Sequence, residues 1–436
     1  MKKQIFFVVF LSVLSSSVSA KSQERQKIEA IFKAKCMDCH SDQTEYPWYF
    51  ELPVVKDIIK ADIEKGKSYF HLQKDLFNYQ NDKDIPKPVI AKLEHEISHD
   101  AMPPIQYKIA HFDRVITKTE EVEILDWLDR LKGTLVEPLK ATTGLNPNKV
   151  ELGKILFHDT RLSGDLTLSC ASCHDLNKGG TDQSQYATGI NGQKGHINSP
   201  TVYNSSYAIK QFWDGRAKDL EAQANGPVNN PVEMGSNWTQ VLERLQEDED
   251  IVDRFKAVFK IHRAKEITSD MVMNSIAEFE KSLVTLGSPF DRYLEGDANA
   301  ITAEEKQGYE LFKKNNCTSC HNGPAVGGAS FQKMGVVRDY FKDREAGVNG
   351  LMKLAVSPED DGRYAVTKNE ADKYKFKVPT LRNVELTYPY FHDGSVTSLK
   401  EAVKYMSYYQ NDKKLSDKEA DLIVAFLKTL TSPSLK

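Results

Sequence analysis

All six cysteines of the chain occur in three copies of one short motif, and this arrangement limits what the chain can fold into. The motifs are Cys36-Met-Asp-Cys39-His40, Cys170-Ala-Ser-Cys173-His174 and Cys317-Thr-Ser-Cys320-His321. In an exported protein, unprotected pairs would be expected as disulfides. A zinc site needs four clustered ligands, whereas these pairs lie far apart along the chain. Two cysteines separated by two residues and followed at once by histidine are typical of covalent c-type haem attachment. The sequence therefore predicts three c-type haems, with His40, His174 and His321 as proximal iron ligands.

Composition indicates a globular chain with one apolar segment at its start. The 436 residues carry a formal net charge of −4 and have a mean hydropathy of −0.50, so we expect no nucleic-acid partner. Residues 1–20, MKKQIFFVVFLSVLSSSVSA, have the basic start, apolar core and small-residue end of a secretory signal peptide. The apolar core is shorter than the ~20 residues of a membrane-spanning helix. We expect cleavage after Ala20 and a periplasmic protein; retention of the segment as an anchor is the alternative.

Repeated segments around the motifs predict the domain organisation. Gly-x-x-Leu-Phe recurs at 153–157 and 308–312, where the glycine would let another helix approach closely. Apolar spacings of three and four, with Ser, Thr or Asp at the start, predict helices over 119–132, 269–286 and 416–430. We therefore expect an all-α fold of three cytochrome c-like haem domains with long loops. Their predicted ranges are 21–140, 146–290 and 291–436, with linkers at 136–149 and 287–300 and the C-terminal helix as a candidate to pack back on the second domain.

From about residue 146 to its C-terminus the chain resembles the bacterial di-haem cytochrome c peroxidase family, which includes the MauG-type enzymes. The shared segments are LFHDTRLSGDLTLSCASCH, NSPTVYN, QFWDGRAKDLEAQANGPVNNPVEM and PTLRNVELTYPYFHDGSVTSLKEAVKYM. The N-terminal part, with CMDCHSDQTEYPWYF and AMPPIQYKIAHF, resembles a haem-binding domain found fused to such enzymes. The resemblance implies an enzyme that reduces hydrogen peroxide to water. It makes the His174 haem the peroxidatic one and the His321 haem the one that accepts electrons.

The resemblance also implies residues for the peroxidatic site. Many members of the family have a histidine sixteen residues after the proximal one, and it blocks the iron until the enzyme is partly reduced. Ile190 stands at that position here and cannot bind iron. We expect an open distal face, with His196 as the alternative group that could cap it. By match, Glu233 is the acid–base residue, Gln223 a second pocket residue and Trp213 the residue between the haems. Burial in an apolar pocket suits such a carboxylate, because it raises the carboxyl pKa toward the working range.

Two further iron ligands follow from the resemblance. The second haem of the family takes a methionine fourteen residues beyond the histidine of YFHDG, which matches Met406. Thioether sulfur raises the haem potential and suits the acceptance of electrons. A tyrosine in this role would indicate a MauG-like enzyme, and Tyr405 is adjacent. For the N-terminal haem, we expect Met102 of the Met-Pro-Pro loop as sixth ligand. The other candidates are His71, the runner-up, and then His95, His99 and His111.

The family also places a calcium ion between its two haems. By match, the ligands are the Asn198 side chain and the backbone carbonyls of Thr387 and Pro389. Oxygen ligands suit this hard cation. Asp175, Arg216 and Arg382 follow haem or turn motifs and are candidate partners for haem propionates, with surface salt bridges as the plainer interpretation.

The function predicted from the sequence is that of a cytochrome c peroxidase with hydrogen peroxide as substrate. The electron donor could be a small cytochrome, a copper protein or a quinol, and related enzymes are commonly homodimers. Two alternatives stay open. One is a MauG-like oxidase that modifies a protein, and the other is a multi-haem electron carrier without catalysis. A carrier should have three six-coordinate irons, whereas a peroxidase needs one open iron.

Overall fold

The chain divides into two units, residues 1–133 and 134–436, each described here by itself. The computed structural model describes residues 24–79, 81–98, 102–103, 107–108, 111, 114–132 and 135–435. The expected signal peptide, residues 1–20, and the candidate ligand His99 lie outside the described residues. Within the described part of the chain, no helix is long and apolar enough to cross a membrane. Residues 135–140, which the sequence assigns to the N-terminal domain, group with the second unit.

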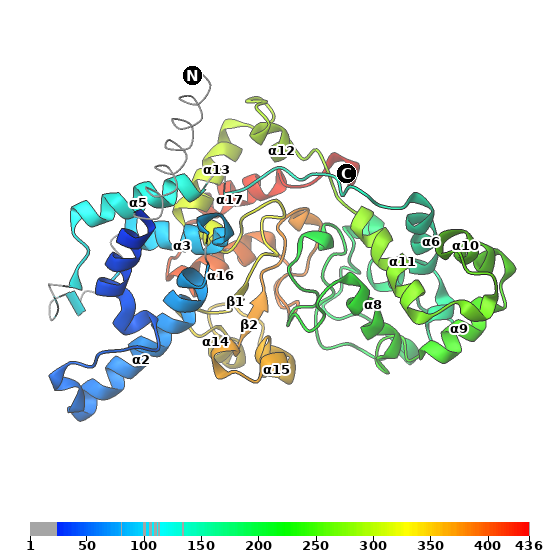
Figure 1. Ribbon diagram of the computed structural model, residues 1–436, viewed down its shortest axis with the longest axis horizontal. Helices are drawn as coiled ribbons and strands as arrows, with labels where there is room; N and C mark the ends of the chain where they lie inside the picture. Colours follow the sequence, from blue (N-terminus) through cyan, green and yellow to red (C-terminus); the bar gives the residue numbers. More distant parts are fainter. Residues whose placement is uncertain are drawn as a thin grey trace, which may run out of the picture. The chain divides into compact units, whose positions relative to one another are not determined.

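The first unit is a set of helices around an apolar core (Figure 1). Residues 24–40 are helical and carry the first haem motif at their end. The other elements are η1 (Trp48–Glu51), α2 (Pro53–Tyr69), the π-helical turn η2 (Leu72–Phe77), η3 (Asp82–Asp84), α3 (Lys87–Ser98) and α5 (Lys118–Lys132). The last helix confirms the prediction over 119–132 and packs against α3. Phe32, Leu72 and Trp127 are buried in this core, and removal of their apolar surface from water stabilises the unit.

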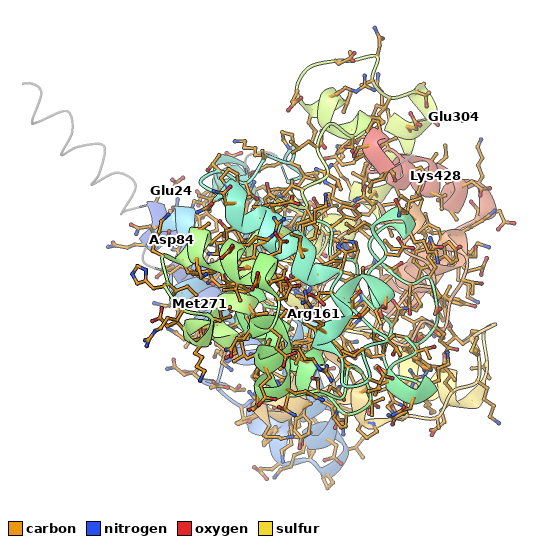
Figure 2. The ribbon with its side chains drawn as sticks, turned by 90° about the vertical axis from the view of Figure 1, so that its right-hand side faces the viewer. Glu24, Asp84, Arg161, Met271, Glu304 and Lys428 are labelled. Carbon is orange, nitrogen blue, oxygen red and sulfur yellow. The ribbon has the colours of Figure 1, made fainter. Side chains whose placement is uncertain are left out.

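Helices α6 (Pro147–Phe157) and α11 (Ser269–Ser282) lie side by side beside the second haem motif (Figure 1). Their close approach depends on Gly153, where an added Cβ would lie 1.9 Å from the Ser275 carbonyl oxygen. This contact confirms the role predicted for the repeated glycine. Around the pair lie η5 (Thr160–Leu162), α7 (Cys170–Cys173), α8 (Leu220–Asn229), α9 (Trp238–Gln246), α10 (Glu249–Phe259) and η9 (Ala264–Glu266). Arg161, labelled in Figure 2, ties η5 to the start of α10 through an ion pair of 2.7 Å with Asp248.

The C-terminal region repeats this arrangement. Helix α13 (Ala303–Lys314) packs on α17 (Asp417–Lys428), and a Cβ at Gly308 would lie 2.0 Å from the Leu422 carbonyl oxygen. The C-terminal helix thus packs on α13 and on α16 (Leu399–Asn411), within its own region. The other helices here are α12 (Pro289–Leu294), α14 (Tyr340–Ala346) and α15 (Tyr364–Thr367). The predicted linker 287–300 therefore contains a helix, which begins at a capping box between Ser288 and Asp291.

Long loops and a small sheet complete the second unit. Residues 175–219 contain only the turns η6 (Leu176–Lys178), η7 (Ile190–Gly192) and η8 (Ser205–Tyr207). The later turns are η10 (Cys317–Ser319), η11 (Pro358–Asp361), η12 (Glu370–Asp372), η13 (Val384–Leu386) and η14 (Pro433–Leu435). Strands β1 (Phe331–Lys333) and β2 (Lys375–Lys377) pair antiparallel, with Phe331 opposite Lys377. The all-α prediction omits this sheet, because strands of three residues carry too little pattern to be recognised.

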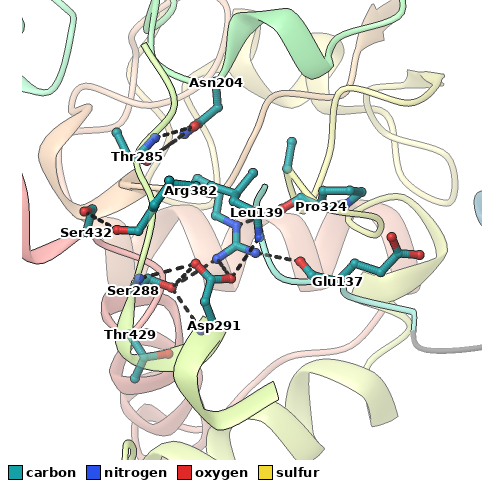
Figure 3. A network of polar contacts seen from close by, with 12 residues as sticks. Glu137, Leu139, Asn204, Thr285, Ser288, Asp291, Pro324, Arg382, Thr429 and Ser432 are labelled. Atoms are coloured by element: carbon teal, nitrogen blue, oxygen red, sulfur yellow. Dashed lines mark hydrogen bonds and ion pairs between the residues drawn. The ribbon is translucent and has the colours of Figure 1, made fainter. Parts of the chain in front are cut away.

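A buried polar network fastens the linker segments of the second unit (Figure 3). The Arg382 side chain is fully buried and lies 2.7 Å from the Asp291 carboxylate. It also donates hydrogen bonds to the carbonyls of Pro324 at 2.9 Å and Glu137 at 2.8 Å. The structure thus gives Arg382 protein partners where the sequence suggested a haem propionate. Because Glu137, Asp291 and Pro324 come from three separate segments, this one side chain links the three segments to one another.

Candidate functional site

Each motif histidine bonds through one ring nitrogen to a backbone carbonyl. The pairs, measured from Nδ1 to oxygen, are His40 with Phe70 at 2.8 Å, His174 with Gly180 at 3.3 Å and His321 with Val326 at 3.2 Å. A carbonyl oxygen can only accept, so Nδ1 carries the proton in all three rings. The lone pair of Nε2 is then available to a metal, and the carbonyl fixes the ring orientation.

Burial keeps these imidazoles neutral. It lowers the pKa of His174 and His40 and lowers that of His321 to about 4. A neutral ring is the form that binds iron. All six cysteines lie in the described part of the chain, and none pairs with another in a disulfide. Two thiols beside a neutral, oriented histidine are the donor set that a covalent c-type haem requires, so the residues present fit this cofactor.

The first unit contains a cavity at its haem motif. Cys36, Cys39 and His40 lie on its wall together with Met102, and most of the remaining wall is apolar. The structure therefore brings Met102 to the same cavity as the proximal histidine. The runner-up His71 is not among the wall residues, and its Nε2 lies 3.2 Å from the Asp42 carboxylate.

In the second unit, backbone contacts bring Ile190 and Glu233 together. The Ile190 backbone N–H donates to the Glu233 carbonyl at 2.8 Å, and the Ile190 side chain is buried against Gly164 and Gly235. His196, only six positions later, is exposed and borders a cavity whose wall includes Arg344 and His392. The loop after Cys173 is thus folded with isoleucine inward and the next histidine outward.

The Glu233 carboxyl group has the environment expected of an acid–base residue. Burial raises its pKa, although Arg216 and a hydrogen bond of 2.7 Å from the Asn230 amide oppose that effect. Glu233 also lies close enough to Cys173 to act on the thiol electrostatically. Gln223 is half-buried in the first turn of α8. Within the described residues no hydrogen bond joins it to Glu233.

Trp213 and Met406 pack against one hydrophobic cluster. The core of this cluster is Met334, Tyr340, Phe341, Leu351, Phe376 and Tyr409, and Tyr405 packs against it as well. The Trp213 indole N–H donates to the Asn198 carbonyl at 2.9 Å, and its ring meets the His392 ring edge-on at 6.4 Å. The tryptophan of the peroxidatic region and the methionine of α16 therefore share a single aromatic environment.

The residues expected to hold calcium lie in neighbouring segments. The Asn198 backbone N–H donates to the His392 carbonyl at 2.8 Å, which places Asn198 beside the segment that carries Thr387 and Pro389. Its side-chain Nδ2 donates to the Ser184 carbonyl at 2.9 Å, and this orients the amide. No group of three or more His, Cys, Asp or Glu side chains in the described ranges is arranged to hold a metal. Amide and carbonyl oxygens form a different kind of site, which suits calcium.

Sequence reasoning missed a buried charge network beside Trp213. Arg344 is almost fully buried and bonds to Asp360 at 2.5 Å and to Asp393 at 2.7 Å. His392 Nε2 lies 2.7 Å from the Asp360 carboxylate. Burial alone would raise the Asp360 pKa, but the bonds from His392 and Arg344 hold it well below its usual range. The YFHDG motif contains His392 and Asp393, whereas Arg344, in α14, and Asp360, in η11, belong to no sequence motif.

Three models of known protein families match the sequence of this chain, and each match includes one of the three haem motifs. The model described as di-haem cytochrome c peroxidase matches residues 147–299. The models for a haem-binding domain and for cytochrome c match residues 12–130 and 305–431.

Individual proteins show the same relationship. The chain is 38% identical over 427 residues to cytochrome c peroxidase Ccp of Escherichia coli (strain K12), covering 94% of this chain and 89% of that protein. It is 49% identical over 296 residues to cytochrome c551 peroxidase of Nitrosomonas europaea, and the match covers 68% of this chain and 84% of that protein. A solved structure of a MauG-like protein associated with microbial copper homeostasis aligns with a TM-score of 0.58 and 28% identity over 69% of this chain and 95% of that one. The chain therefore belongs to the di-haem cytochrome c peroxidase and MauG family of oxidoreductases, with a haem-binding domain at its N-terminus.

Proposed function

We propose that the chain is a periplasmic tri-haem peroxidase that reduces hydrogen peroxide to water and works without prior reductive activation. The observation that carries the proposal is the pairing of Ile190 with Glu233 after the Cys170 motif. An isoleucine side chain cannot bind iron, and Ile190 stands at the sequence position of the family's blocking histidine. His196 is exposed and borders the cavity whose wall includes Arg344 and His392.

Proton movement falls to Glu233 in this proposal. When bound, the haem of the Cys170 motif would supply the iron that holds peroxide and the electrons that cleave its oxygen–oxygen bond. The ionised Glu233 carboxylate takes the proton from the inner peroxide oxygen and delivers it to the outer oxygen, which leaves as water. Two electrons and two protons convert one hydrogen peroxide into two waters. Gln223 would orient the peroxide by hydrogen bonding.

Electrons would reach this site through the other two haems. We assign His40 and Met102 to the iron of the N-terminal haem and His321 and Met406 to the iron of the C-terminal one. Trp213 supports this path, because it packs against the same cluster as Met406. A calcium ion held by Asn198, Thr387 and Pro389 would fix the segments beside Trp213. The donor is a small cytochrome, a copper protein or a quinol, and a homodimer is the expected assembly.

A MauG-like oxidase is the second candidate, because Tyr405 packs against the same cluster as Met406. The two assignments differ in the ligand of the second haem. Methionine ligation gives a long-wavelength sulfur-to-iron absorption band in the oxidised protein. Replacement of Met406 by leucine should remove the share of this band that belongs to the second haem and leave the share of the Met102-ligated N-terminal haem. A band unchanged in Met406→Leu, together with an altered spectrum of the second haem in Tyr405→Phe, would favour the MauG-like assignment.

The Glu233→Gln variant tests the proposed chemistry. The amide keeps the size of the side chain but cannot take a proton, so peroxide turnover should fall by about 10²–10⁴-fold while all three haems remain bound. Glu243→Gln, at an exposed carboxylate on α9, is the matched control and should retain full activity. Wild-type turnover in Glu233→Gln would exclude Glu233 as the base. Turnover of the wild type only after partial reduction would contradict the open distal face.

A further inference from the structure

An apolar patch lies on the surface of the first unit. Trp48 is 90% exposed, Val54 74%, Leu52 54%, Ile58 53% and Tyr46 52%. All five belong to η1, the start of α2 or the residues just before them, so they form one continuous surface segment, which we call the Trp48 patch. Isolated apolar side chains on a surface are ordinary, but a contiguous group marks an interaction site.

A row of aromatic rings leads inward from this patch. The Trp48 ring lies 5.6 Å from the Tyr49 ring, and Tyr49 lies 5.9 Å from the His111 ring, to which its hydroxyl group also bonds. His111 stacks on Tyr107 at 4.3 Å. Tyr107 forms part of the wall of the cavity that is also lined by Cys36, Cys39 and His40. Four rings therefore connect an exposed tryptophan to the N-terminal haem cavity without a long gap.

Exposed acidic side chains flank the Trp48 patch in the sequence. Glu45 is 86% exposed, Glu51 79% and Asp42 71%, and each also forms an ion pair, with Arg114 at 4.0 Å, Lys56 at 3.1 Å and Lys67 at 3.6 Å respectively. Over residues 41–60 the chain has four acidic residues and two lysines, which gives this segment a net charge of −2. An acidic rim around an apolar centre is complementary to a partner with a basic rim around an apolar centre. Such complementarity speeds association and selects the partner.

We propose that the Trp48 patch docks a small basic electron-transfer protein and that the rings of Trp48, Tyr49, His111 and Tyr107 carry its electron to the N-terminal haem. The inference rests on the proposed function, in which this haem passes electrons to the peroxidase. One electron leaves the donor, which is oxidised, and the N-terminal haem is reduced by one electron with no proton transferred. Trp48 is the anchor of the interface, since a central tryptophan ringed by polar residues is typical of a binding hot spot.

Stopped-flow reduction of the N-terminal haem tests the docking site in the full-length, haem-loaded protein. The probe is reduced mitochondrial cytochrome c, a small basic cytochrome. We expect Trp48→Ala to lower the second-order rate constant at least tenfold. The double variant Glu45→Gln/Glu51→Gln should lower the rate and weaken its dependence on salt. Val122→Ala, which removes a 55% exposed apolar side chain elsewhere in the same unit, is the control and should change nothing.

Tyr49→Leu tests the row of rings separately from docking. It leaves the patch in place but removes the second ring, so the rate at saturating donor should fall while the half-saturating donor concentration stays the same. An unchanged saturating rate would overturn the electron path through the rings.

Other occupants of the patch give different results. If Trp48→Ala is reduced as fast as the wild type, the proposed docking site is wrong. If the variant keeps the wild-type reduction rate but loses binding to phosphatidylglycerol vesicles, the patch binds a membrane. If it keeps that rate but loses self-association, the patch binds a second copy of the chain. Both of these results also overturn the proposal. Peroxide turnover with ascorbate and a small mediator separates this inference from the proposed function. That turnover should be equal in wild type and Trp48→Ala, and its absence in the wild type would reject the proposed function itself.

Discussion

Replacement of Gly153 by alanine tests the packing of α6 against α11, the helix pair in the core against which Cys170 packs. A Cβ at this position would lie 1.9 Å from the Ser275 carbonyl oxygen and 2.9 Å from the Phe279 Cβ. Since real Cβ contacts lie beyond 3.0 Å, the helices must separate by about 1 Å. Alanine gains about 1 kcal/mol in helix propensity. Overpacking a close contact costs about 1–3 kcal/mol, and the upper part of that range, about 2–3 kcal/mol, applies here because the obstacle is backbone that cannot rotate away.

The expected net effect of Gly153→Ala is a loss of about 1–2 kcal/mol in the free energy of unfolding, which guanidinium unfolding followed by circular dichroism would measure. Gly308→Ala should behave in the same way, because its Cβ would lie 2.0 Å from the Leu422 carbonyl oxygen. Gly195→Ala is the control, since its nearest neighbour would be at 3.6 Å. If Gly153→Ala proves as stable as the wild type or more stable, the close-packing argument is refuted.

Three further predictions concern charged groups. Arg382→Met leaves Asp291 buried without its cation and should lower the free energy of unfolding by about 3–5 kcal/mol; an unchanged urea midpoint would contradict the network. Burial raises the pKa of Glu280 from 4.5 to about 8, so the folded state binds an extra proton and stability falls as pH rises from about 4.5 to 8. Glu280→Gln should flatten that decline in thermal unfolding and add up to about 3 kcal/mol at pH 7. Burial also raises the pKa of Glu233, which acts as base only when ionised, so kcat/KM should fall as pH drops through that raised pKa, and Glu233→Gln should lack this dependence.

The helices and their contacts were accessible from the sequence because their signals are local. The N-caps at Thr268 and Ser416 and the apolar spacing that follows mark α11 and α17 to within a few residues. The repeated glycines at 153 and 308 predicted close helix contacts, and the structure confirms both. Strands β1 and β2 could not be found in this way, since each has three residues and is stabilised by a partner more than forty positions away.

Polar networks were less accessible because their members are dispersed along the chain. Arg344 forms ion pairs with Asp360 and Asp393, which lie sixteen and forty-nine positions further along the chain. No regular spacing of residues in the sequence predicts such ion pairs. Arg382 was expected as a partner of a haem propionate or as a surface salt bridge, and its buried partner Asp291 lies in a segment predicted as a linker. The position of Ile190 was accessible by resemblance, whereas the bond that holds it to Glu233 required the folded chain.

The central claim is that the His174 haem has an open distal face in the resting protein. Electron paramagnetic resonance on the fully oxidised protein, before and after one equivalent of hydrogen peroxide, tests it most directly. The account predicts a high-spin ferric signal from one haem of the three, which peroxide removes without prior reduction. Three low-spin signals that do not respond to peroxide would contradict it, because they would mean that His196 or another side chain caps the iron.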